Sequence, residues 1–216
     1  MTGGPKTHGP TIGLLGSACL FVLAAAYYPG GTTFSASTVG YDWTRNFIST
    51  LFAPTALNGS ANAARSFAIP AMLLLCASLA FVFKNISRKA KSKVHRKTIE
   101  IAGIGSMVYS SLVVTPMHNL MVNIGLLFFV AAVLATLHAL YVERELRLLL
   151  VGLSGLVLLL ASAVMYYGNV LYELLPIFQK ASFIACAGWL VAVHYSEFGG
   201  TADASAAPRK TVEPTR

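Results

Sequence analysis

Residues 101–142 read IAGIGSMVYSSLVVTPMHNLMVNIGLLFFVAAVLATLHALYV, a stretch of 42 residues between Glu100 and Glu143 without a single Asp, Glu, Lys or Arg. One helix needs only about 20 apolar residues to cross a membrane. The stretch is therefore long enough for two helices, and Thr115-Pro116 is the natural break between them. Thr favours the N-cap of a helix, and Pro favours the first helical position, where its missing N–H would have no partner anyway.

The apolar runs along the whole chain predict six membrane spans. These spans cover residues 11–28, 67–83, 99–114, 116–141, 148–167 and 175–195. The predicted fold class is all-α: a polytopic membrane bundle of six transmembrane helices, in one membrane domain of residues 1–198. Residues 199–216 are rich in Gly, Ala, Ser, Thr and Pro, and we expect a disordered cytoplasmic tail there.

The basic residues lie mostly on one side of these spans. Of the 16 Lys and Arg residues, 13 fall in the two terminal segments, the loop between the second and third spans, and the loop between the fourth and fifth. Only Arg45, Arg65 and Lys180 fall on the other side. Because cytoplasmic loops carry an excess of Lys and Arg, this asymmetry predicts a multi-pass protein of the cell membrane with both termini cytoplasmic.

The net charge of +8 does not indicate a nucleic-acid partner. Seven of the basic residues lie in the loop 84–97, and no aromatic residue interleaves them as nucleic-acid binding would favour. We expect this loop to lie against the anionic head groups of membrane lipids. The sequence therefore predicts membrane lipids as partners and no nucleic acid.

The longest external loop contains an amphipathic pattern. Asp42, Arg45, Asn46 and Ser49 are spaced as one face of a helix, and Trp43, Phe47, Ile48 and Leu51 would form the other face. This spacing predicts a short external amphipathic helix over residues 41–52, lying flat in the membrane interface with Trp43 as its aromatic anchor. The alternative is a loop helix that only covers the bundle.

The polar residues of the spans gather near the outer ends. His118, Asn119 and Asn123 lie in the first turns of the fourth span, on the same side of the membrane as Asp42, Arg45, Asn46 and Ser49. Polar side chains at membrane depth face the bundle or a wet cavity rather than lipid. These seven residues are the candidate ligand-binding residues of an outward-facing pocket. The alternative is that they pair with one another, for example Asp42 with the first turn at His118, and close the top of the bundle.

Metal and cofactor chemistry finds little support in the sequence. A zinc hydrolase needs about three His ligands at one depth, and the outer half offers only His118. His138 and His194, near the cytoplasmic ends of their helices, favour interfacial roles over ligation of a haem. Cys19, Cys76 and Cys186 all lie inside spans and fit packing roles rather than a disulfide framework. The sequence thus predicts neither a metal nor another cofactor.

Two short motifs resemble a known family. Asn46-Phe47-Ile48-Ser49-Thr50-Leu51 after the first span and Met117-His118-Asn119-Leu120 at the start of the fourth resemble the bacterial six-helix membrane proteins catalogued as domain of unknown function 998. The resemblance covers about residues 11–198 and departs at Phe52, where that family usually has Gly. It implies the same topology and brings no established activity.

Three functions remain open from the sequence. The first is a non-enzymatic membrane protein that binds or passes a small or amphiphilic ligand through the outward-facing pocket. The second is a membrane-embedded hydrolase or transferase, with Ser49 as nucleophile, His118 as base and Asp42 as orienting acid. No Gly-x-Ser-x-Gly motif surrounds Ser49. The third is a structural or accessory subunit.

The predicted topology is testable by labelling of introduced cysteines. We expect a cysteine at position 92 to be labelled only from the cytoplasm, because Ser92 lies in the basic loop. A cysteine at position 58 in the long loop should be labelled only from outside. Labelling of position 58 from the cytoplasm in intact cells would contradict the six-span topology.

Overall fold

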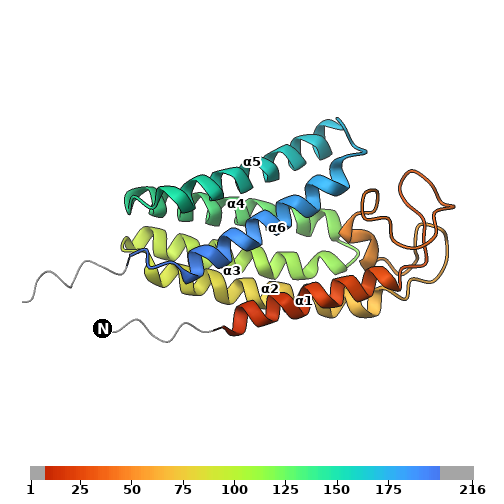
Figure 1. The fold of residues 1–216 in the computed structure, drawn as a ribbon, viewed down its shortest axis with the longest axis horizontal. Helices are drawn as coiled ribbons and strands as arrows, with labels where there is room; N and C mark the ends of the chain where they lie inside the picture. The colour runs from red at the N-terminus through yellow and green to blue at the C-terminus, as the bar shows by residue number, and fades with distance from the viewer. Residues whose placement is uncertain (1–7, 200–216) are drawn as a thin grey trace, which may run out of the picture.

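The computed structural model describes residues 8–199 and shows a bundle of six α-helices (Figure 1). In chain order the helices are α1 (Gly9–Ala26), α2 (Arg65–Lys89), α3 (Lys93–Ser111), α4 (His118–Val142), α5 (Leu146–Gly168) and α6 (Leu175–Tyr195). Two short 3-10 helices, η1 (Ile48–Phe52) and η2 (Leu112–Val114), lie before α2 and before α4. The described residues contain no β-strand, only two isolated β-bridges inside the long connection between α1 and α2.

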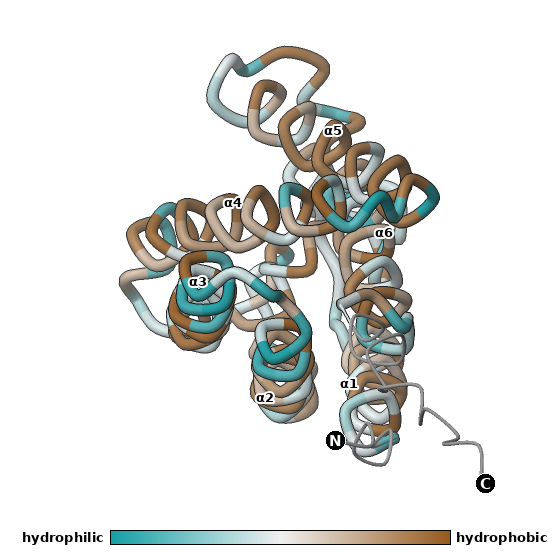
Figure 2. Tube along the Cα trace, turned by 90° about the vertical axis from the view of Figure 1, so that its left-hand side faces the viewer, coloured by the Kyte–Doolittle hydropathy of each residue, from teal (hydrophilic) through white to brown (hydrophobic). Residues whose placement is uncertain are grey.

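The bundle has two chemically different ends. Residues 27–64 form a long folded connection at one end, which we call the long-loop end (Figure 1). The α2–α3 and α4–α5 turns lie at the other end, the basic end, where Figure 2 shows hydrophilic colour on the near turns of α2 and α3. Lys89 at this end donates hydrogen bonds to the carbonyls of Val193, His194 and Ser196, at 3.2, 2.5 and 2.6 Å. A cation at the C-terminus of α6 is favourable because the exposed carbonyls carry partial negative charge.

Five helices within the described residues are long and apolar enough to cross a membrane: α1, α2, α4, α5 and α6. This result confirms five of the six predicted spans as apolar helices. The third predicted span also folds as a helix, but α3 begins at Lys93 and its first turns carry Arg96, Lys97 and Glu100. Residues 99–114, the predicted span, cover the rest of α3 together with η2 and are about 25 Å long at about 1.5 Å per residue, slightly less than the hydrocarbon core of about 30 Å.

The break between α3 and α4 differs from the predicted one. Thr115 does not cap α4: its hydroxyl donates to Leu112 O at 2.7 Å, and the helix begins two residues after Pro116, at His118. The reason is that η2 continues α3 for one more turn, so the chain reverses direction over residues 115–117. The prediction of Pro116 as the first helical residue was therefore wrong by two residues.

The predicted amphipathic helix over residues 41–52 is not formed as one helix. Residues 43–45 make a turn, Phe47 is extended (φ −75°, ψ 152°), and only η1 is helical, as a 3-10 helix. The side chains of Asp42 and Asn46 bind nearby backbone groups, and such local bonds compete with helix formation. Leu51 and Phe52 are buried against the bundle, so the segment is a packed part of the fold.

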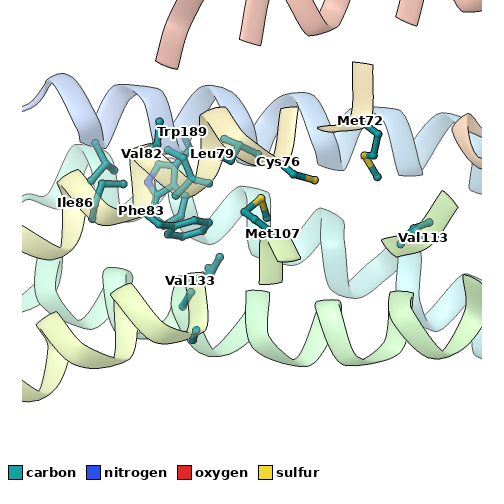
Figure 3. Packing of buried hydrophobic residues seen from close by; sticks show 14 of the residues in the cluster. Met72, Cys76, Leu79, Val82, Phe83, Ile86, Met107, Val113, Val133 and Trp189 are labelled. Atoms are coloured by element: carbon teal, nitrogen blue, oxygen red, sulfur yellow. The ribbon is translucent and has the colours of Figure 1, made fainter. Parts of the chain in front are cut away.

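One group of buried residues lies toward the basic end. Phe83 and Ile86 are fully buried, and Figure 3 shows them grouped with Val82, Leu79 and Trp189. Met72 and Val113 lie apart from this group, further along the bundle (Figure 3). The buried core continues to the long-loop end, where Leu51 and Phe52 belong to it. Of the predicted disordered tail, residues 200–216 lie outside the described residues.

A close contact between α5 and α6 predicts a stability effect. A Cβ added at Gly152 on α5 would lie 2.5 Å from the ring of Trp189 on α6. That ring is buried and its Nε1–H donates to Leu148 O at 2.8 Å, so it cannot swing aside. We expect Gly152→Ala to lower the free energy of unfolding by about 1–3 kcal/mol through overpacking. Thermal unfolding in detergent measures this effect.

Gly188 is the matched control for this substitution. It also lies inside a helix, but an added Cβ there would meet no atom within 4 Å. Gly188→Ala should therefore leave the melting temperature unchanged or slightly raised. Equal melting temperatures for the two variants would contradict the close contact of α5 and α6.

Candidate functional site

A cavity of about 520 Å³ lies inside the bundle. Its walls come from α1, α2, α3, α4, α5, α6 and both 3-10 helices, so side chains of every helix contribute. The deep part is apolar, with Leu79, Met107, Phe129, Leu159 and Leu190 among its lining residues. A size of several hundred Å³ and a mainly apolar wall are typical of ligand sites.

Polar side chains line the cavity near the long-loop end. Four of the seven predicted site residues are among them: Ser49, His118, Asn119 and Asn123. The other three, Asp42, Arg45 and Asn46, do not line the cavity. The structure therefore brings the η1 and α4 residues together around one space and leaves the turn before η1 outside it.

His118 is oriented by a backbone carbonyl. Its Nδ1 lies 2.8 Å from Val113 O, and because a carbonyl only accepts hydrogen bonds, Nδ1 must carry the proton. In the neutral ring this leaves the lone pair on Nε2 as an acceptor. His118 is half-buried and lines the cavity, so this acceptor is the chemistry that it offers to a ligand.

Asp42 does not bind the first turn of α4, which corrects the predicted contact with His118. Its Oδ1 accepts hydrogen bonds from Thr44 Oγ1 at 2.6 Å, Thr44 N at 2.8 Å and Arg45 N at 3.2 Å. In the described part of the chain its carboxylate has no other hydrogen-bond partner. These bonds, led by the Thr44 hydroxyl, lower the pKa of Asp42 below its usual value. The carboxylate acts as the local partner of a turn, and Arg45 is exposed.

Asn46 is fully buried and fixes the long loop to the bundle. Its side chain donates to Gly31 O at 2.8 Å and accepts from Asp42 N at 2.9 Å. Its carbonyl accepts from Lys180 Nζ at 2.5 Å and from the hydroxyl of Tyr41 at 3.2 Å. Burial raises the pKa of Tyr41, so this hydroxyl stays a donor. Asn46 is thus a structural residue and not a ligand-binding residue.

Gln179 is one of the polar lining residues that the sequence did not predict. Its Oε1 accepts the backbone N–H of Ile48 at 3.1 Å, which fixes the orientation of its amide and attaches η1 to α6. The sequence signal for Gln179 is that it forms a polar pair with Lys180 in an otherwise apolar span. Gln179 lines the cavity, whereas Lys180 does not.

The cavity reaches the protein surface between α4 and α5. Its exposed lining residues come mostly from these helices: Asn119, Val122 and Asn123 on α4, and Tyr166 and Tyr167 on α5. One hydrogen bond, from the hydroxyl of Tyr167 to Asn123 Oδ1 at 2.6 Å, joins the two helices there. In Figure 1, α5 leans away from α1 and α2 toward the long-loop end. Access to the cavity is therefore lateral, from the side of the bundle.

Two histidines that the sequence analysis placed in interfacial roles are found at the basic end. His138 on α4 lies beside His95 on α3, with 2.7 Å between Nδ1 and Nε2, while His194 is buried on α6. Within the described residues, no group of three His, Cys, Asp or Glu side chains gathers at one point. Cys76 and Cys186 line the cavity as free thiols.

No protein-family model, curated protein or solved structure matches this chain. The resemblance to the six-helix family therefore stays a prediction. The function proposed below is therefore based on the geometry of the cavity.

The role of Asn46 predicts a loss of stability. Asn46→Ala removes both side-chain bonds and leaves Gly31 O and Asp42 N without these buried partners. We expect a loss of about 1–3 kcal/mol in the free energy of unfolding, the cost of unsatisfied buried groups. Limited proteolysis of the long loop and thermal unfolding in detergent report this loss.

Asn58→Ala in the same loop is the control. Asn58 is exposed, and its side chain makes only one short-range bond, accepting from Ser60 N at 3.0 Å. This variant should unfold within about 0.5 kcal/mol of the unmodified protein. If both variants resist proteolysis equally, Asn46 does not hold the loop.

Proposed function

We propose that the chain is a six-span integral membrane protein that binds a small or amphiphilic ligand in the cavity between its helices. In this proposal α3 crosses the membrane together with the other five helices, because it lies between α2 and α4 and its apolar part is shorter than the bilayer core by only a few Å. Shorter spans are accommodated by local thinning of the bilayer. The basic first turns of α3 then reach the lipid head groups.

The excess of Lys and Arg at the basic end supports the orientation. By the positive-inside rule the basic end and both termini face the cytoplasm, and the long-loop end faces outward. The polar end of the cavity then lies at the outer interface, and its apolar part reaches toward the membrane centre. A molecule with a polar head and an apolar chain matches this gradient.

The observation that carries the proposal is the cavity itself. An accessory subunit needs no such space, since a bundle with a purely structural role gains from dispersion contacts when its core is filled. The dense packing around Phe83 shows that this sequence fills its core elsewhere. The lateral access between α4 and α5 further favours a ligand that comes from the membrane.

The enzymatic alternative finds less support. Ser49 and His118 both line the cavity, but no hydrogen bond joins them in the described residues. The predicted orienting acid, Asp42, is engaged with Thr44 and Arg45, so it does not orient His118. A nucleophile needs a base within hydrogen-bond reach, and the structure shows no such pair.

Filling the cavity tests the proposal. Ala163 lines the cavity from α5, and Ala163→Phe places a ring inside it. Because the ring occupies the space of a ligand, we expect at least about a tenfold loss of copurifying lipid per protein, equivalent to about 1.4 kcal/mol of binding. Mass spectrometry of extracts from the purified protein quantifies the bound lipid.

Ala161→Phe is the matched control, since Ala161 lies on the same helix and does not line the cavity. Size-exclusion profiles of both variants verify folding. If Ala163→Phe folds and retains as much lipid as Ala161→Phe, the cavity does not bind a ligand and the accessory-subunit alternative is favoured.

A further inference from the structure

The cavity, although it has a polar end, is lined by no ionic side chain. Among its lining residues there is no Asp, Glu, Lys or Arg. The charged residues nearest in sequence have other partners or are exposed. Lys180 donates to Asn46 O and Pro176 O and lies over the ring of Tyr41, while Glu173 is exposed.

A charged head group bound at the polar end would therefore gain no ionic partner from the lining residues. Burial of an unpaired charge is strongly unfavourable, whereas an uncharged polar head needs only hydrogen bonds. The polar end supplies these bonds. The amide nitrogen of Gln179 has no hydrogen-bond partner in the described residues, because its oxygen is the atom that faces Ile48 N. In the neutral ring, Nε2 of His118 is an acceptor.

An amide donor and an imidazole acceptor in one cavity match a hydroxyl group, which both accepts and donates one hydrogen bond. A cavity of about 520 Å³ is in the size range of sites that bury most of a drug-sized ligand, so its apolar part has room for an apolar chain.

We infer that the ligand is a lipid with an uncharged hydroxyl head, held by His118 and Gln179 and entering between α4 and α5. This inference rests on the proposed function and specifies the ligand. Straight-chain alcohols and isoprenoid alcohols share this chemistry. A phospholipid or a fatty-acid anion does not.

The test compares probes that differ only in the head group. Dodecanol, its methyl ether, dodecanoate and dodecyltrimethylammonium are each titrated into the purified full-length protein in an amine-oxide detergent, whose head has no hydroxyl group, and bound probe is counted by native mass spectrometry. We expect dodecanol to bind with one-to-one stoichiometry and at least about tenfold tighter than either charged probe. The methyl ether, which has no donor for His118, should bind about fivefold more weakly, the ratio of one net hydrogen bond.

His118→Leu keeps the size of the side chain and removes the acceptor. The preference for dodecanol over its ether should disappear in this variant and persist in His138→Leu, a histidine variant of the same helix outside the cavity. A preference that survives in His118→Leu overturns the assigned head-group site. Farnesol in the same assay distinguishes isoprenoid from straight-chain alcohols; tight binding of either supports the inference.

The outcomes separate this inference from the proposed function. If charged probes bind as tightly as dodecanol, the uncharged head is wrong while ligand binding stands. If no probe binds and Ala163→Phe retains the lipid of the unmodified protein, the proposed function itself fails.

Discussion

The buried backbone and side chain of Asn46 connect the long loop to the membrane bundle. Every polar group of this residue has a partner: its N–H donates to Asp42 O, its carbonyl accepts from Lys180 and Tyr41, and its amide binds Gly31 O and Asp42 N. Buried polar groups are costly unless they are all paired, so this network specifies one position of the loop. The neighbouring bond from Ile48 N to Gln179 then sets the position of η1 above the cavity.

The same network explains why the cavity has its particular chemistry. Lys180 is a charged residue inside an apolar helix, and its ammonium group is satisfied by carbonyls of the loop and of α6. The charge is therefore directed away from the cavity, while the amide of Gln179, one residue earlier, faces it. Loop attachment and the absence of charge in the cavity are two consequences of one contact between α6 and residues 46–48.

The helices were predictable from sequence because apolar runs about 20 residues long have few other stable arrangements in a chain. The loop was not, and the reason is visible at Asn46. Its spacing from Asp42, Arg45 and Ser49 suggested the exposed face of a helix, but amide side chains also bind backbone groups of turns. Which option is realised depends on Gly31 and Lys180, which are 15 and 134 residues away in the chain. Similarly, the carbonyl that binds His118 belongs to Val113 in η2, a 3-10 turn that the sequence pattern did not predict.

The distribution of polar partners also separates a binding site from a closed bundle end. In a closed end, polar groups satisfy one another, as Asn46 and Asp42 do. At the cavity the pairing is incomplete in the described residues: His118 uses one ring nitrogen and Gln179 uses its oxygen, and the complementary atoms of both residues are left over. These two atoms, an acceptor and a donor, belong to residues that line the same cavity, whose remaining wall is mainly apolar. The neighbouring core is filled by packed side chains. A bundle whose end only needed closing would place such groups in contact with each other. No hydrogen bond joins them in the described residues, so a polar molecule in the cavity can complete the hydrogen bonds of both.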